Sequence, residues 1–215
     1  MSSSFPNGTV FSIGTAYGSD VTISSVSNAN PGVASATAHG LSDADIILLS
    51  VSSSRLDGKV VRVDSSTTDT FELEGINTTS TTLYPTGFGA GTAKDVTTWV
   101  PMSQVSDTAS EGGEPNFATW VFLDDGKQRR RPTFTNARGL TLTMHYDPSL
   151  AWHDALINAA QLGTIHAIRA ALPSGAFLYY GAYIAFDGEP TFTVNVNQEV
   201  SLNMSFTNTH TRYAS

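Results

Sequence analysis

The chain has 215 residues, of which 40% are hydrophobic and only 14% are charged, and its formal net charge is −8. This acidic balance argues against a protein that grips nucleic acid, because such binding depends on Lys and Arg contacts with phosphates. The absence of cysteine excludes disulfide cross-links and zinc–thiolate sites.

The N-terminus and the hydropathy pattern predict neither export nor membrane insertion. Residues 1–6 lack the basic and apolar regions of a signal peptide. No stretch approaches the ~20 consecutive apolar residues of a membrane span. We therefore expect a protein that is made and kept in solution and has no membrane partner.

The first predicted strand covers residues 9–16, and a block of short strands then runs from 21 to 93. The strands predicted in this block are 21–26, 33–38, 46–51, 60–63 and 70–73. Short strands separated by turn signals predict a small, self-contained β-barrel or sandwich. The sequences TAHGL at 37–41, LDGK at 56–59 and TFEL at 70–73 resemble a small β-domain found in ubiquitin-activating enzymes and in phage structural proteins.

The segment after this block is expected to contain little regular structure. A Gly/Thr-rich run at 86–92 is interpreted as a linker, and a new strand begins at Thr98. Residues 106–115 are polar and glycine-rich, which favours a long loop. Loops of such length inside a compact domain are usually functional or ordered by a partner.

The last part of the chain predicts a β-sheet with one packed helix. Alternating runs at 133–145 and 191–207 predict two long strands, with further strands at 165–172 and 177–186. The helix is expected at 150–162, with Asp147 as its N-cap and Gly163 at its C-terminal end.

The order of these elements resembles that of a tail tube protein of a long-tailed, siphophage-like bacteriophage. The resemblance covers residues 1–20 and 94–215. It rests on the sequence GLTLTM at 139–144, the helix, the strand at 165–172 followed by PSG at 173–175, and the strand at 177–186. The block at 21–93 is then an inserted small β-domain, expected on the exterior.

The resemblance implies a mainly β fold, a tail-tube-type β-sandwich or barrel with one flanking helix. It implies a structural subunit, not an enzyme, that self-assembles into stacked hexameric rings and forms the conduit for DNA ejection. Its partners would be further copies of itself, the tape measure and tail terminator proteins, and DNA passing without specific binding. The protein would be made in the host cytoplasm and reside in the virion tail. The alternative is a surface adhesin or carbohydrate-binding β-module.

The polar side of the strand predicted at 191–207 contains no Lys or Arg. A channel for a polyanion functions best without cations that hold phosphate. The candidates for lining the lumen are Asn195, Asn197 and Glu199, with Asp187 and Glu189 at the rim. In the alternative interpretation, Glu199 pairs with an arginine across the subunit interface.

A basic cluster in the segment 105–132 is the candidate for contacts between subunits. Arg129, Arg130 and Arg131 are expected to pair with carboxylates of the same subunit or, preferentially, of a neighbour. The candidate carboxylates are Glu111, Glu114, Asp124 and Asp125. This segment is expected to cross the boundary between rings.

No catalytic, cofactor or metal site is predicted. His39 with Asp43 and Asp45 could be drawn as a metal site, but a histidine before glycine in a turn is more often structural. His145, Asp147, His153 and Asp154 gather near the start of the predicted helix, where His153 and Asp154 should point to different sides. The aromatic residues Phe117, Trp120 and Phe122 could form a sugar-binding platform, although packing is the commoner role of such residues.

Overall fold

The computed structural model describes residues 7–214, so the expectation for residues 1–6 lies outside the described part. The fold is mainly β, as predicted, with one helix among the described residues, α1 (Ala151–Leu162). The strands are β1 (Val10–Tyr17), β2 (Val21–Ile23), β3 (Ser25–Val26), β4 (Gly32–Ser35), β5 (Ile46–Val51), β6 (Val60–Asp64), β7 (Thr70–Leu73), β8 (Gly91–Met102), β9 (Val105–Glu111), β10 (Pro115–Val121), β11 (Gln128–Thr135), β12 (Gly139–His145), β13 (Ile165–Ala171), β14 (Phe177–Ala185), β15 (Glu199–Phe206) and β16 (Thr211–Tyr213).

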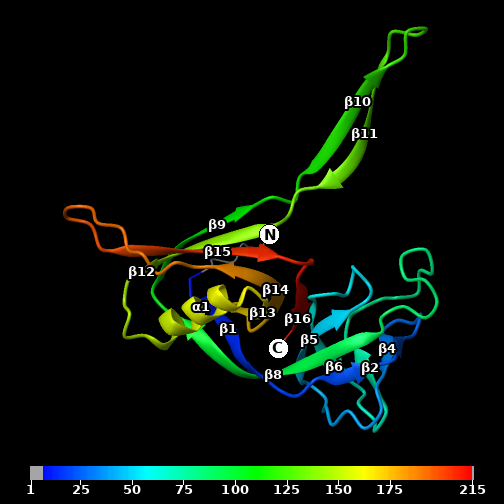
Figure 1. Cartoon of the computed structure of the whole chain (residues 1–215), viewed down its shortest axis with the longest axis horizontal. Coiled ribbons are helices and arrows are strands. Elements are labelled where there is room, and N and C mark those ends of the chain that lie inside the picture. Colours follow the sequence, from blue (N-terminus) through cyan, green and yellow to red (C-terminus); the bar gives the residue numbers. More distant parts are fainter. Residues whose placement is uncertain (1–6, 215) are drawn as a thin grey trace.

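The strands other than β10 and β11 form one 14-stranded sheet in the order β3-β4-β7-β6-β5-β8-β1-β13-β14-β15-β12-β9, with β16 beside β14 and β2 beside β8. Figure 1 shows that the 21–93 block lies at one end of the molecule and that α1 lies beside β13 and β14. The first strand is part of the main sandwich, because β1 pairs with β13 and β8 and its Ile13 belongs to the core beneath α1.

The helix packs on β1, β8 and β14, and its buried side chains share one core with side chains of β12 and β15. Alternate residues of the strands point toward it, and the largest fully buried side chains there include Trp152, Leu156, Leu142 and Met144. Gly163 ends the helix with φ of 61°, the left-handed conformation that glycine adopts without a steric penalty.

The predicted N-cap is wrong, because Leu150 occupies the cap position and makes no side-chain cap hydrogen bond. Asp147 instead closes a turn before the helix, where its Oδ1 accepts hydrogen bonds from the hydroxyl and the backbone N–H of Ser149. These bonds stabilise the charged carboxylate and lower the pKa of Asp147.

Further predictions of secondary structure are wrong. The run at 133–145, expected as one strand, is divided between β11 and β12, and the strand expected from Thr98 begins at Gly91. The expected loop at 106–115 and the segment after it form β9, β10 and β11. The polar strand β9 is held by backbone pairing with β12, and β10 and β11 pair with each other. The long strand expected at 191–207 begins only at Glu199. Its last partner is His145, after which the chain of β12 turns toward α1, so residues 191–198 have no strand beside them and form a loop.

The 21–93 block has its own buried core. Its predicted strands correspond to β2 through β7, and their apolar side chains, such as Ile47, Leu49, Phe71 and Leu73, form one cluster. The block is nevertheless joined firmly to the rest, because β8 pairs with β2 and β5 through its first half and with β1 through its second half.

A third buried cluster lies between the block and the main sandwich, and we call it the seam. Its buried members are Val60, Val96, Ala167, Tyr179 and Tyr213. The two parts also approach each other through backbone at Gly181, where an added Cβ would lie 1.7 Å from the carbonyl oxygen of Gly58. This close approach requires glycine at position 181.

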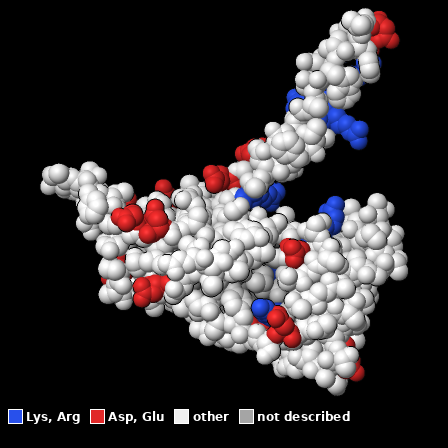
Figure 2. Space-filling model, in the orientation of Figure 1, with Lys and Arg blue, Asp and Glu red and all other residues white. Residues whose placement is uncertain are grey.

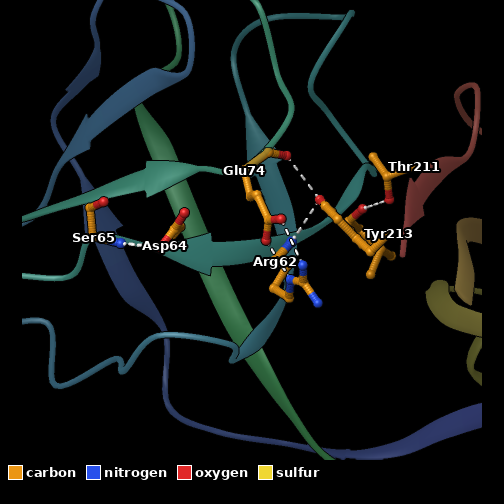
Figure 3. Close-up of polar contacts among 7 residues, drawn as sticks. Arg62, Asp64, Ser65, Glu74, Thr211 and Tyr213 are labelled. Carbon is orange, nitrogen blue, oxygen red and sulfur yellow. Dashed lines mark hydrogen bonds and ion pairs between the residues drawn. The ribbon is translucent and has the colours of Figure 1, made fainter. Parts of the chain in front are cut away.

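The C-terminal strand contributes the polar contacts of the seam (Figure 3). The hydroxyl of Tyr213 accepts a hydrogen bond from the backbone N–H of Arg62 at 2.9 Å and donates one to the carbonyl of Glu74 at 3.0 Å. Arg62 also forms an ion pair with Glu74 and lies 4.6 Å from the centre of the Tyr213 ring. Burial raises the pKa of Tyr213, so its hydroxyl keeps the proton that it donates.

We expect Tyr213→Ala to lower the free energy of unfolding by about 3–5 kcal/mol, because it removes a buried aromatic ring from the seam. Tyr213→Phe should cost about 1–3 kcal/mol, since it leaves polar groups of Arg62 and Glu74 without their partner. Chemical denaturation followed by circular dichroism measures both. The exposed neighbour Arg212→Ala is the control, and an unchanged midpoint for Tyr213→Ala would show that the seam contributes little.

Candidate assembly surfaces

Strands β10 and β11 form a separate two-stranded hairpin that projects from the body of the molecule (Figure 1). A two-stranded hairpin alone is at best marginally stable in water, because it has no face covered by a core. This projection therefore points to a partner that covers it.

Apolar side chains are exposed on both faces of the hairpin. The register pairs Trp120 with Arg129 and Ala118 with Arg131, so these four side chains share one face, which we call the Arg131 face. Trp120 is 39% exposed, and Phe122, which Arg129 covers on the same face, is 51% exposed.

The opposite face carries Phe117 and Arg130, and the guanidinium of Arg130 lies 3.9 Å from the centre of the Phe117 ring. Phe117 is 44% exposed and Val121, on the same face, is 54% exposed. Apolar residues exposed together in this way mark interaction surfaces, and here both faces of the ribbon offer one.

The basic cluster lies on this hairpin, and the structure separates its three arginines. Arg129 forms an ion pair with Asp125 of its own hairpin. Within residues 7–214, no carboxylate lies within 4.0 Å of the charged groups of Arg130 or Arg131. The other candidate carboxylates lie apart, with Glu111 in β9 opposite Gly139, Glu114 before β10 and Asp124 at the tip. Pairing of Arg130 and Arg131 with a neighbouring subunit stays a prediction.

A second projection, the loop 187–198, lies at the opposite end of the view in Figure 1 from the hairpin. Its apolar side chains are strongly exposed, at 78% for Phe192 and 86% for Val194. Asn195 and Asn197 belong to this loop, so they lie off the strand that was expected to carry them. Glu199 is the first residue of β15.

The part of the sheet face opposite α1 that β9, β12 and β15 form is polar. Strands β9, β12 and β15 contain no Lys or Arg. Their outward positions hold Asp107 beside Thr143 and Ser201, and Thr141 beside Asn203, whose Oδ1 accepts a hydrogen bond from the Thr141 hydroxyl. At its edge, β9 has no neighbour among the described residues beyond β12, so one side of its backbone is open to pairing.

Charge is distributed unevenly on the view in Figure 2. Acidic side chains gather at the end that carries the loop 187–198, while the hairpin carries basic side chains along its length and acidic ones at its tip and base. Much of the remaining surface on that view is uncharged. The cluster of acidic side chains at one end favours contact with basic side chains of a second copy.

The histidines take structural positions. The ring of His39 accepts a hydrogen bond from the backbone N–H of Leu41 and lies edge-on to Phe71. His145 lies beside Glu199, with 3.8 Å between Nδ1 and Oε1, while His153 is buried against Phe186. In the part of the chain that the structure describes, no group of three His, Cys, Asp or Glu residues could hold a metal ion.

The hairpin is the main feature that the sequence interpretation missed. Its signal was the turn sequence DDGK at 124–127, which follows the aromatic and β-branched run at 117–123. The described helix is too short and too polar to cross a membrane.

The chain matches the family described as "Phage tail tube protein, TTP" over residues 51–215. No curated protein matches it. Among solved structures it is similar to a chain of the virion of a native gene transfer agent particle, with 11% identity, a TM-score of 0.41 and coverage of 54% of this chain and 89% of that chain. It is also similar to a chain of the sheath–tube complex of an extracellular contractile injection system, PVC, in the extended state, with 17% identity, a TM-score of 0.35 and coverage of 50% and 80%. A third similar structure is the cap that terminates the tube of the anti-feeding prophage, with 20% identity, a TM-score of 0.33 and coverage of 50% and 79%.

Proposed function

The chain belongs to the family of phage tail tube proteins and is a structural subunit of the virion tail, and we propose that its copies close into hexameric rings that stack into the tube of a siphophage-like tail. The observation that carries this proposal is the hairpin β10–β11, whose two faces expose aromatic residues and which forms its own two-stranded sheet. Assembly covers these faces.

Ring closure has a physical basis in the sheet itself. Strand β9 is an open edge at one end of the large sheet. The unpaired backbone N–H and C=O groups of such an edge are a template for pairing with a strand of another chain. Pairing of this edge with a neighbouring copy satisfies its backbone groups. The loop 187–198 and the hairpin then reach toward adjacent rings.

We assign the polar face of β9, β12 and β15 to the lumen. Its outward side chains are hydroxyls, an amide, Ala109, His145 and the carboxylates of Asp107, Glu111 and Glu199. No Lys or Arg is among them and His145 lies beside the Glu199 carboxylate, so the wall offers DNA no permanent cation to hold it. Asp187 and Glu189, with Asn195 and Asn197 in the projecting loop, lie at the rim. DNA passes through this conduit during ejection without specific binding.

We assign residues 21–93 to an inserted small β-domain on the exterior of the tube. Its separate core supports this assignment, and the seam holds it against the sandwich as a rigid attachment. The family match begins at residue 51, inside this block, and continues through β8 into the sandwich. Partners at the two ends of the tube are the tape measure and tail terminator proteins.

An adhesin or carbohydrate-binding module is less well supported. A sugar stacks on the free face of an aromatic ring, and the arginines lie over Phe117 and Phe122 at 3.9 and 4.6 Å. One face of each of these two rings is therefore covered, which leaves Trp120 as the one ring of the candidate platform without an arginine of the described residues stacked on it.

Negative-stain imaging of the purified full chain tests the proposal. We expect rings or tubes, together with a sedimenting fraction that grows with protein concentration, because subunit association depends on concentration. A compact monomer at every concentration would contradict the proposal and favour the binding-module alternative.

A further inference from the structure

We propose that the Arg131 face of the hairpin docks in an open groove beside the end of β14 on a second copy of this chain, with Arg131 facing Glu189. The inference rests on the proposed function, since it names the surface that the projecting hairpin covers in the assembly.

The groove has a volume of about 590 Å³ and combines apolar and acidic lining. Ala160, Ile184 and Ala185 contribute apolar surface where β14 extends past the end of β13. Asp187, Glu189 and Glu199 contribute carboxylates, and no Lys or Arg lines it. It therefore accepts an apolar surface that carries positive charge.

Two of the carboxylates already have contacts within the chain. Oδ1 of Asp187 accepts a hydrogen bond from the backbone N–H of Glu189 at 3.1 Å, and Oε1 of Glu199 accepts one from the Ser106 hydroxyl at 3.2 Å. Glu189 is exposed, and no basic group lies within 4.0 Å of its carboxylate in the part of the chain that the structure describes. Its negative charge is the one available to a partner.

The Arg131 face is complementary to this groove. Its neighbour across the hairpin is Ala118, which is too small to cover the guanidinium, and Trp120 supplies apolar surface on the same face. Arg130, on the opposite face, is already engaged over Phe117. A guanidinium with free donors is well suited to a carboxylate at a partly desolvated surface.

Other grooves on the molecule fit this occupant less well. The two grooves at Gly139 include Arg138, and the groove between the end of α1 and the 21–93 block includes Lys94. A cation in the lining repels the hairpin. The groove at 38–43 and 66–68 has one carboxylate, Asp43, and no aliphatic floor like that beside β14.

The two surfaces belong to different copies because they lie at different ends of one molecule. The hairpin projects from one end in Figure 1, and the groove lies beside the loop 187–198 at the other. A contact between unlike surfaces is heterologous, and repeated heterologous contacts generate rings or helical tubes.

Charge reversal and charge exchange in the full chain test the pair. Arg131→Glu and Glu189→Arg are each expected to raise the concentration needed for assembly at least about tenfold, because a like-charge contact replaces an opposite-charge one. The double variant Arg131→Glu/Glu189→Arg should return to within about threefold of the parent chain. Lys127→Glu, near the tip of the hairpin and outside its paired register, is the matched control, with an effect below about threefold.

Cross-linking provides a second measurement that keeps the charged pair intact. Since the chain has no cysteine, Ala118→Cys/Ala185→Cys places one thiol on the Arg131 face and one in the groove. A short bis-maleimide should join chains into a ladder on a denaturing gel. Thr119→Cys/Ala185→Cys, with the first thiol on the opposite face, should give little ladder.

The outcomes separate this inference from the proposed function. If the parent chain does not assemble, both fail. If the parent assembles while Arg131→Glu assembles equally well, or while the two cysteine pairs cross-link alike, the groove is not the docking site and only the inference is overturned. Thermal unfolding of each variant near that of the parent shows that an assembly defect is not a folding defect.

Discussion

Replacement of residues 117–132 by Asn-Gly is expected to give a folded chain that forms neither rings nor tubes. The deleted residues form the outer part of the hairpin, which makes a sheet of its own and exposes its aromatic residues. The body should therefore keep its stability, with a shift in unfolding midpoint of at most a few degrees, since an exposed hairpin contributes little to the core. Asn-Gly closes the shortened hairpin with a favoured two-residue turn.

Negative-stain imaging and sedimentation measure the loss of assembly, and thermal unfolding by circular dichroism measures the fold. The control replaces only residues 123–126, the exposed tip, and keeps both faces of the hairpin. This control should assemble as the parent does. Normal tubes from the longer deletion would show that the hairpin does not carry the contacts between subunits.

Lysines introduced at Thr141 and Thr143 are expected to leave the tube intact and to make it retain DNA. Both side chains lie on the polar face of β12 while their neighbours Leu142 and Met144 are buried, and neither side chain lines the groove beside β14, so the substitutions should disturb neither the core nor the docking contact. Each lysine that contacts a phosphate adds about 0.9 to the slope of log affinity against log salt. The effect is repeated in every subunit of every ring.

Two assays measure this effect: retention of short duplex DNA by purified tubes at low and high salt, and the rate of genome ejection from assembled tails. The glutamine variants of Thr141 and Thr143 are matched controls that add length without charge. Strong, salt-sensitive retention only in the lysine variant is the expected result. Ejection at the parental rate from correctly assembled lysine-variant tails would place β12 outside the lumen.

Tolerance of the chain to removal of the 21–93 block is limited by the seam. Excision of the block removes Val60, which packs in the seam with Tyr213, and Arg62, whose backbone N–H donates a hydrogen bond to the Tyr213 hydroxyl. It also uncovers the aromatic rings of Tyr179 and Tyr213. The 21–93 block is thus closely integrated with the rest of the chain. A design that removes it needs polar replacements on the uncovered side of the seam.

The sequence by itself determined the mainly β class, the helix that ends at Gly163, and the positions of most short strands in the 21–93 block. These features depend on local chemistry: alternation of apolar residues, helical spacing and turn residues act between neighbours in the chain. The likeness to tail tube proteins also followed from the order of these elements, and the family match agrees with it.

The tertiary structure alone decided which alternating runs become strands and what they pair with. Residues 191–198 alternate as regularly as β15, yet they form a loop because the chain of β12 turns away after His145 and leaves them no partner. Residues of β9 look like a loop in sequence but pair with β12. The seam joins Tyr213 to Arg62 across 151 positions of the chain. Pairing and burial of this kind depend on groups far apart in sequence, so local patterns do not contain them.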